Sequence, residues 1–239
     1  MPKLHIFKNE KETCQAFAGW LAGTISEALV NNEKFTIAIA QGDIPAMLYK
    51  ILATEYADKI EWSKVHVFAA NHRLVSNVSS DTTFNDFTTQ LSIPKEQVHN
   101  IPTNLSHEEA IAKYEALLQQ YFDGEPAFDL AILSMGEDGS FLSFHAGDDD
   151  NNVLVSNIVA IQNKVDNTYS ITLTKQAINA AKMKAFLVTG KKKEDAVQQV
   201  LNGKYDPEKY PAQLIVTTDK TVHWFFDEAA AAKLIKPTP

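Results

Sequence analysis

The chain has 239 residues, of which 45% are hydrophobic and 22% charged, with only 9 glycines and 9 prolines. This composition is typical of a globular protein with a sizeable core and excludes disordered and fibrous folds. A net charge of −8 argues against a general surface for nucleic acid or acidic membranes, and the only cysteine, Cys14, cannot form an intramolecular disulfide or a Cys-based metal site.

Runs of β-branched and aromatic residues alternate with stretches of helical period. In chain order the pattern predicts a helix over 10–30, a strand over 35–40, a helix over 45–56, a strand over 65–68, a helix over 107–122, strands over 129–133 and 185–188, a helix over 192–202, strands over 214–216 and 222–226, and a helix over 227–235. Ser106 and Glu109 form a capping-box signature, and Asp227 is expected to cap the last helix.

This alternation favours parallel strands joined by helical crossovers, because nearly continuous apolar strands are expected where helices cover both faces of a sheet. We therefore predict a single α/β domain over residues 1–239, built as a doubly wound, mostly parallel Rossmann-like sheet flanked by helices. Ligands bind such sheets at the carboxyl ends of the strands. The loops after Ala40, Phe68, Leu133 and Thr189 are thus the expected site.

Two further features of the sequence bear on cations and location. Asp148-Asp149-Asp150-Asn151-Asn152 is interpreted as a solvated acidic loop, with a cation site as the alternative. No apolar run reaches the ~18 residues that a bilayer span needs, and residues 1–8 lack a signal-peptide core. We expect a cytoplasmic protein with no membrane or nucleic-acid partner.

Segments at the strand ends resemble the 6-phosphogluconolactonases and their relatives, the glucosamine-6-phosphate deaminases/isomerases. Ala40-Gln41-Gly42-Asp43-Ile44-Pro45 stands where lactonases have Ser-Gly-Gly-Ser-Thr-Pro, Ala69-Ala70-Asn71-His72-Arg73 where they have Gly-Asp-Glu-Arg, and Ser134-Met135-Gly136-Glu137-Asp138-Gly139-Ser140-Phe141-Leu142-Ser143 is similar to Gly-Met-Gly-Glu-Asp-Gly-His-Thr-Ala-Ser. Further similarity lies at 171–174, 178–181, 189–193, 211–214 and 224–230. The resemblance implies hydrolysis of 6-phosphogluconolactone to 6-phosphogluconate, in the pentose phosphate pathway, without a metal or organic cofactor.

The resemblance assigns the catalytic base to the His after Asp-Gly, a position that Ser140 occupies here. A serine hydroxyl cannot accept a proton near neutral pH without a neighbouring base. His145 and His72 are the nearby imidazoles and, with Asp138, are our catalytic candidates. The alternatives are that His145 is an ordinary loop side chain and that His72 is a wall residue without a catalytic role.

The loop of Asn71 and His72 lacks the Asp-Glu pair of the family. In the deaminases a carboxylate here moves a proton between C1 and C2, and an amide such as Asn71 cannot accept it. Isomerase and deaminase chemistry by that route is therefore disfavoured more firmly than hydrolysis.

The expected substrate-binding residues are Gly42, Asp43, Asn71, Arg73, Gly136, Gly139, Ser140 and Lys193. Asp43 would repel a phosphate, or it caps the helix that begins near Pro45. Arg73 and Lys193 suit an anion, although Lys191–Lys193 could equally be a solvated basic turn. The Arg that the family has before Ile-Thr-Leu-Thr is Ser170, and its Asp-Ser-Asn-Tyr segment is Asp81-Thr82-Thr83-Phe84.

Three hypotheses remain open at this stage. The first is an active lactonase for 6-phosphogluconolactone or a related sugar lactone, with a relocated histidine as base. The second is a catalytically silent family member that binds a sugar phosphate or another metabolite. The third is a changed specificity, in which Gln41 and Asp43 bind hydroxyls or an amine of an unphosphorylated sugar. In each case the partner is a small molecule, and the protein is expected to be a monomer or a homodimer.

Overall fold

The computed structural model describes residues 2–42, 44–74, 82–91, 93–147, 156–163, 167–215 and 221–235. Its centre is a seven-stranded sheet in the order β1-β10-β9-β6-β2-β3-β5, in which every neighbouring pair is parallel. The strands are β1 (Lys3–Phe7), β2 (Phe35–Ile39), β3 (Val65–Ala69), β5 (Val98–His99), β6 (Leu130–Leu133), β9 (Met183–Val188) and β10 (Val222–Asp227). The predicted mostly parallel sheet is confirmed.

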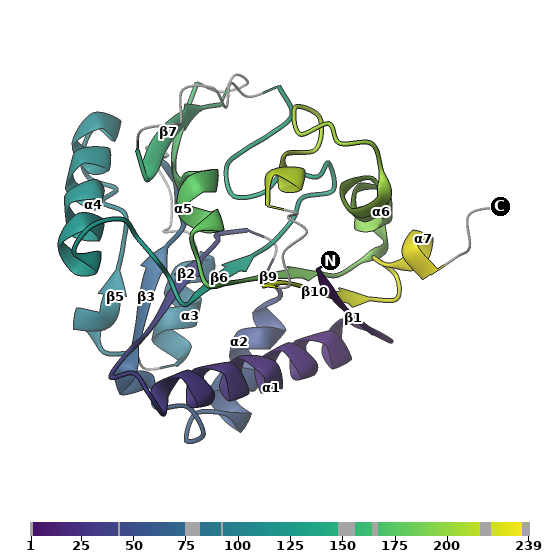
Figure 1. The fold of residues 1–239 in the computed structure, drawn as a ribbon, viewed down its shortest axis with the longest axis horizontal. Coiled ribbons are helices and arrows are strands. Elements are labelled where there is room, and N and C mark those ends of the chain that lie inside the picture. The colour runs from purple at the N-terminus through teal and green to yellow at the C-terminus, as the bar shows by residue number, and fades with distance from the viewer. Residues whose placement is uncertain are drawn as a thin grey trace.

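Helices cover both faces of this sheet. They are α1 (Glu10–Leu29), α2 (Ala46–Glu55), α3 (Thr82–Gln90), α4 (His107–Phe122), α5 (Lys175–Asn179), α6 (Glu194–Asn202) and α7 (Ala232–Ile235). In Figure 1, α1, α2 and α3 lie below the sheet, and α4, α5 and α6 lie above it. Strands β2 and β6 are buried along their whole length, as strands covered on both faces must be.

The capping prediction for α4 is confirmed in detail. The Ser106 hydroxyl accepts the N–H of Glu109 at 3.3 Å, and the Glu109 carboxylate accepts the N–H of Ser106 at 3.2 Å. The helix ends at Asp123, whose left-handed backbone (φ 51°) stops further helical turns.

A second, three-stranded antiparallel sheet was not predicted from the sequence. It has the order β4-β8-β7, formed by Asn71–Leu74, Tyr169–Leu173 and Ile158–Gln162. Strand β4 follows β3 after a single residue, Ala70, and so carries the residues after β3 into this sheet. The sheet packs against α4 through β7 and β8.

Two predicted elements at the C-terminal end are wrong. Instead of a strand over 214–216, Pro211–Leu214 form a 3-10 helix and Ile215 a turn, while Val216 lies outside the described residues. Buried Gln213 explains this, because its amide accepts the N–H of Asp206 at 2.6 Å and donates to the carbonyls of Gln199 and Lys204. These bonds tie the segment to neighbouring loops rather than to the sheet.

The predicted helix over 227–235 is reduced to α7, because Asp227 ends β10. The Asp227 carboxylate accepts the N–H of Ala230 at 2.8 Å, so its expected capping contact is present, but it closes a turn before the helix. The carboxylate also accepts the N–H of Gly190 with both oxygens, at 3.0 and 3.1 Å. Asp227 therefore joins β10 to the loop after β9.

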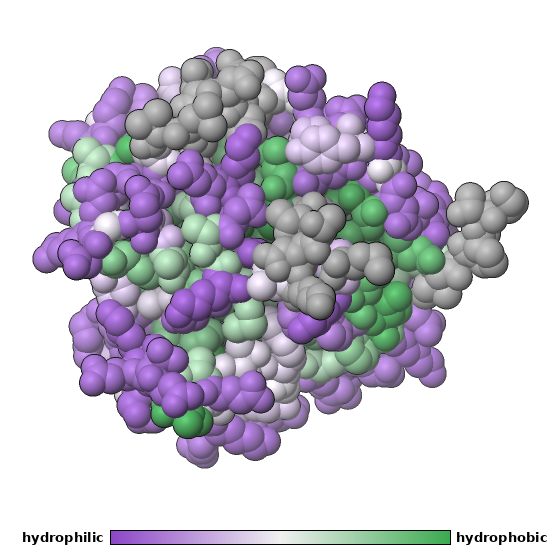
Figure 2. All heavy atoms as spheres, in the orientation of Figure 1, coloured by the Kyte–Doolittle hydropathy of each residue, from purple (hydrophilic) through white to green (hydrophobic). Residues whose placement is uncertain are grey.

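The surface is mostly polar, as expected for the composition. Figure 2 shows hydrophilic side chains over most of one face, with hydrophobic surface gathered on the side where Figure 1 places β1. On that edge strand Leu4 is 46% exposed and Ile6 38%. Within the described part of the chain, no helix has the length and apolarity to cross a membrane.

Histidine pairs stack on neighbouring strands at both edges of the large sheet. His66 Nδ1 and His99 Nε2 lie 3.3 Å apart, as do His5 Nε2 and His223 Nδ1. Burial, with the positive charges of His66 and Lys34, lowers the pKa of His99 to about 4. Burial, with the charges of Lys3 and His5, lowers the pKa of His223 to about 4 as well.

These histidines should make the fold sensitive to acid. Between pH 6.5 and 4 the unfolded chain takes up protons that the folded chain does not, so stability falls as the pH is lowered. Melting temperatures are compared at pH 7 and pH 5. We expect the double variant His99→Phe/His223→Phe to lose roughly 2–4 °C less than the parent over this interval. His145→Gln, which removes an exposed imidazole, is the control, and an equal loss in all three proteins would contradict the assignment.

Candidate functional site

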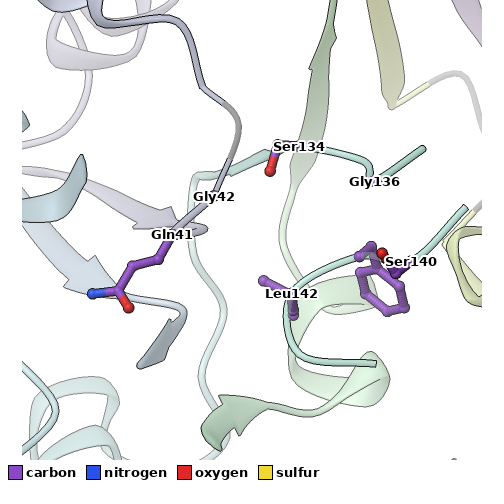
Figure 3. A pocket seen from close by; sticks show the side chains of 7 residues that line it. Gln41, Gly42, Ser134, Gly136, Ser140 and Leu142 are labelled. Carbon is purple, nitrogen blue, oxygen red and sulfur yellow. The ribbon is translucent and has the colours of Figure 1, made fainter. Parts of the chain in front are cut away.

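A pocket lies where the strand order reverses. From β2 the chain continues to β3 and β5 on one side, whereas from β6 it continues to β9 and β10 on the other. The loops after β2 and β6 therefore diverge and leave a crevice at the carboxyl ends of the strands. The cavity there has a volume of about 150 Å³. Its described lining residues are Gln41, Gly42, Ser134, Gly136, Ser140, Phe141 and Leu142 (Figure 3).

Two glycines make room for neighbouring side chains at the pocket. Gly42 has φ 146°, in the region that side chains rarely adopt, and a Cβ there would come within 2.9 Å of Ser134 Oγ. A Cβ on Gly136 would meet the Ser140 hydroxyl and would lie 2.7 Å from Asp138 Oδ1. Gly42 therefore lets the two loops approach each other, whereas Gly136 makes room for Asp138 and Ser140 of its own loop.

Asp138 organises the turn after β6. Its Oδ1 accepts the N–H of Ser140 at 3.0 Å, and Gly136 N–H donates to the Ser140 carbonyl at 2.9 Å. Burial raises the pKa of Asp138, but hydrogen bonds from the Ser140 hydroxyl and backbone, and attraction to His145, together hold it below the usual value. Asp138 is thus an ionised carboxylate at the edge of the pocket.

His145 lies on the other side of this carboxylate. Its Nδ1 is 3.8 Å from Asp138 Oδ2, and its side chain is 59% exposed. The structure therefore brings together Asp138, Ser140 and His145 from one loop. The Ser140 hydroxyl pairs with the carboxylate rather than with an imidazole, so the three do not form a Ser-His-Asp nucleophilic triad.

His72 and Asn71 join the loop after β2 to the second sheet. The N–H of Gln41 donates to Asn71 Oδ1 at 2.8 Å, and Asn71 Nδ2 donates to Ser143 Oγ at 3.3 Å. Gln41 Nε2 lies 3.0 Å from His72 Nδ1. In Figure 3 the amide of Gln41 points away from Ser134 and Ser140, so its stem faces the pocket and its polar end holds His72.

The two cations differ in their surroundings. Arg73 is exposed on β4, where its Nε donates to Thr168 Oγ1 at 3.3 Å. It stands directly opposite Ser170 on β8. Lys193, by contrast, is only 6% exposed, in the 3-10 helix Lys191–Lys193 that leads into α6.

The Lys193 loop is anchored by carboxylates. Lys193 N–H donates to the carbonyl of Gly190, whose own N–H is held by Asp227, and Thr189 donates to Glu10 at 3.0 Å. Lys192 Nζ lies 3.3 Å from Glu137 Oε1, which brings this loop beside the loop after β6. Lys193 thus belongs to the same edge of the sheet as the pocket, rather than to a fully solvated basic turn.

Several expected site residues have a defined place and others do not. Gly42, Gly136 and Ser140 line the cavity, Asp138, His145, Asn71 and His72 border its loops, and Gly139 shapes the turn after β6. Asp43 and the acidic segment 148–152 lie outside the described residues. The N-cap of α2 is Pro45.

Sequence reasoning did not select Ser134, Phe141 or Leu142, although they line the cavity. The signal for Ser134 was present, because it follows a predicted strand directly. Among the described residues, no three His, Cys, Asp or Glu side chains group as metal ligands would.

Comparison with known proteins identifies relatives along nearly the whole chain. A family model described as glucosamine-6-phosphate isomerases/6-phosphogluconolactonase matches residues 8–224. A probable 6-phosphogluconolactonase 2 of Arabidopsis thaliana is 32% identical and covers 97% of this chain and 95% of its own length. A 6-phosphogluconolactonase of Nostoc sp. is 34% identical, covering 88% of this chain and 89% of its own length.

Solved structures show the same architecture. The 6-phosphogluconolactonase of Thermotoga maritima has a TM-score of 0.79 at 25% identity, covering 95% of this chain and all of its own. The 6-phosphogluconolactonase of Leishmania guyanensis has a TM-score of 0.83 at 19% identity, covering 99% of this chain and 100% of its own.

The turn after β6 can be tested by adding one methyl group. Gly139 has φ 81°, and a Cβ there would lie 2.9 Å from Tyr210 Cδ1. We expect Gly139→Ala to lower the free energy of unfolding by about 1–3 kcal/mol, measured by urea denaturation. Gly23→Ala in α1, where a Cβ would meet nothing within 4 Å, is the control and should not destabilise the protein. Equal stability of Gly139→Ala and the parent would contradict the tight turn.

Proposed function

The chain belongs to the glucosamine-6-phosphate isomerase/6-phosphogluconolactonase family, and on this premise we propose that it hydrolyses 6-phosphogluconolactone, or a closely related sugar lactone, to the open acid. The observation that carries the proposal is the Ser140–Asp138–His145 arrangement beside a pocket at the strand reversal. It supplies an imidazole on the same loop in which Ser140 stands at the position of the family's catalytic His. The proposed compartment is the cytoplasm, and the proposed partners are small molecules alone.

Hydrolysis needs a base that activates water. Of the seven histidines, His5, His66, His99 and His223 pair with each other on the sheet, and His107 stacks on Tyr169 at 4.0 Å. His72 is engaged with Gln41, which leaves His145 as the imidazole beside the pocket turn. The Asp138 carboxylate, whose Oδ2 lies 3.8 Å from His145 Nδ1, orients the imidazole to accept a proton from water.

The remaining steps use groups at the pocket wall. Water adds to the lactone carbonyl carbon while His145 takes its proton, and the Ser134 hydroxyl donates a hydrogen bond to the developing oxyanion. When the carbonyl forms again, the bond to the ring oxygen breaks and His145 returns the proton to that oxygen. Lys193 binds the phosphate by a charge-assisted hydrogen bond.

Isomerisation or deamination is a weaker proposal for this site. Those reactions move a proton between adjacent carbons and need a carboxylate at the loop after β3. Here Asn71 holds that place, and its amide is bonded to Gln41 and Ser143. An amide cannot accept the proton, so hydrolysis is favoured.

Direct assay tests the proposed function. With freshly generated 6-phosphogluconolactone at neutral pH, acid release should give kcat/KM of at least ~10⁴ M⁻¹s⁻¹, a usual lower bound for enzymes. A rate equal to spontaneous hydrolysis, together with binding of 6-phosphogluconate in calorimetry, would instead identify a silent binding member of the family. If the protein shows no turnover and also binds no 6-phosphogluconate, both proposals are refuted.

The role of His145 can be separated from binding. His145→Gln should lower kcat by about 10²-fold or more, with KM changed less than twofold, because general-base catalysis acts in the transition state. His107→Gln is the matched control and should keep kcat within twofold. Unchanged turnover in His145→Gln would exclude this imidazole as the base.

The role of Lys193 can be tested with a neighbouring lysine as control. Lys193→Met should raise KM for the phosphorylated lactone by roughly 10–100-fold and leave KM for glucono-lactone, which has no phosphate, nearly unchanged. Lys192→Met removes a lysine that is 82% exposed and should change neither constant by more than twofold. A similar rise of KM for both lactones would indicate a structural role for Lys193.

A further inference from the structure

Leu142 has an unusual backbone for a leucine. Its φ is 50°, in the left-handed region, where the only other described residues with side chains are Asp123 and Asn167. Asp and Asn enter that region readily because their short polar side chains bond locally, whereas the Cβ of a leucine crowds the following carbonyl. Such strain persists only where the surroundings enforce it, and it gathers at functional sites.

The surroundings of Leu142 do enforce it. Phe144 N–H donates to the Phe141 carbonyl at 2.9 Å and Phe141 N–H to the Phe144 carbonyl at 3.3 Å, so Leu142 and Ser143 form a two-residue turn. The rings of Phe141 and Phe144 stack at 5.3 Å and are each 2% exposed. The Ser143 hydroxyl accepts from Asn71 Nδ2. The turn is therefore fixed at both ends and at its second residue.

The strained turn presents an apolar side chain to the pocket. Figure 3 shows Leu142 beneath Ser134 and Gly42, between the loop after β2 and Ser140. Leu142 and Phe141 are the apolar part of the described lining, and Ser134 and Ser140 supply its hydroxyls. The cavity of about 150 Å³ holds roughly five waters at ~30 Å³ each, which is room for one sugar-sized ring. A phosphate on such a ring has to extend out of the cavity.

We propose that Leu142 is a specificity-determining residue that packs on the C–H face of the ligand's lactone ring. The hydroxyls of Ser134 and Ser140 then meet the polar edge of the ring, and the turn holds the leucine against its own backbone preference to make this contact. The inference rests on the proposed function, because it takes the ligand to be a cyclic sugar lactone. It selects rings with an apolar face at this wall over rings with a polar group there.

The test separates apolar contact from backbone strain. Leu142→Asn keeps nearly the same shape and suits the left-handed backbone, but it replaces methyl groups by an amide. We expect KM for 6-phosphogluconolactone to rise about tenfold, kcat to change less than threefold and the melting temperature to stay level or rise, since roughly two buried methyl equivalents are lost from binding. Leu142→Met, which restores an apolar side chain, should return KM to within threefold of the parent.

Asp123→Gly at the end of α4 is the matched control, because it relieves a φ of 51° far along the chain from the pocket. It should leave KM unchanged. An unchanged KM in Leu142→Asn would overturn the proposal, because it would mean that the turn has a purely structural role. A lower KM would also overturn it, because it would mean that the leucine side chain obstructs binding of the ligand. Should the parent protein show no turnover, the same variants are compared by calorimetric binding of glucose 6-phosphate, a phosphorylated sugar that keeps a closed ring. A tenfold weaker Kd in Leu142→Asn then supports the contact, and an equal Kd refutes it.

Discussion

The pairing of β2 with β6 is the constraint on which the pocket depends. At the start of the two strands, Thr36 N–H and hydroxyl both donate to Asp129 Oδ2, at 2.8 and 2.9 Å, and Asp129 N–H donates back to the Thr36 hydroxyl at 2.9 Å. This exchange sets the register in which Ile37 faces Leu130 and Ile39 faces Ile132. Because the register is fixed there, the loops at the opposite ends of both strands begin level with each other.

The chain direction then opens the crevice. The segment after β2 leads toward β3 and the segment after β6 leads toward β9. Because the two segments diverge, neither crossover fills the space between the carboxyl ends of β2 and β6. Gly42, which has no side chain, lets the loop after β2 approach Ser134 of the loop after β6 without filling the cavity. The β9 loop is brought to the same edge by bonds to Asp227 and Glu10, which lie on other elements. The site is thus held by carboxylates that need not touch any ligand.

Much of this arrangement could be predicted from the sequence, because the buried strands are short apolar runs and α4 carries its own capping residues. The second sheet could not, since β4 is the mostly polar run Asn71–Leu74 and reads as a loop until β8 pairs with it. For the same reason, the opposition of Arg73 and Ser170 appears only in the structure. Sequence similarity predicted that the strand-end loops form the site, but it did not show that Asp138 stands between Ser140 and His145.

Other features of the site are not indicated by any pattern in the sequence. Positive φ is expected at glycine, and nothing in the sequence marks Leu142 as left-handed. Its conformation follows from hydrogen bonds between Phe141 and Phe144 and from ring stacking, which are tertiary contacts of a local segment. The Gln41–His72 contact likewise joins the loop after β2 to strand β4 of the second sheet. Conformational propensities apply to single residues and therefore do not predict contacts between residues that are brought together by the fold.

The turn between Phe141 and Phe144 has a consequence for the evolution of the molecule. Its two ends are fastened to each other and to the core, so the residue at 142 can be exchanged with little effect on the surrounding scaffold. A single codon could therefore retune ligand preference while the sheet, its helices and the neighbouring loops stay as they are. The same property makes this position a natural place to introduce diversity when new lactone hydrolases are sought by directed evolution.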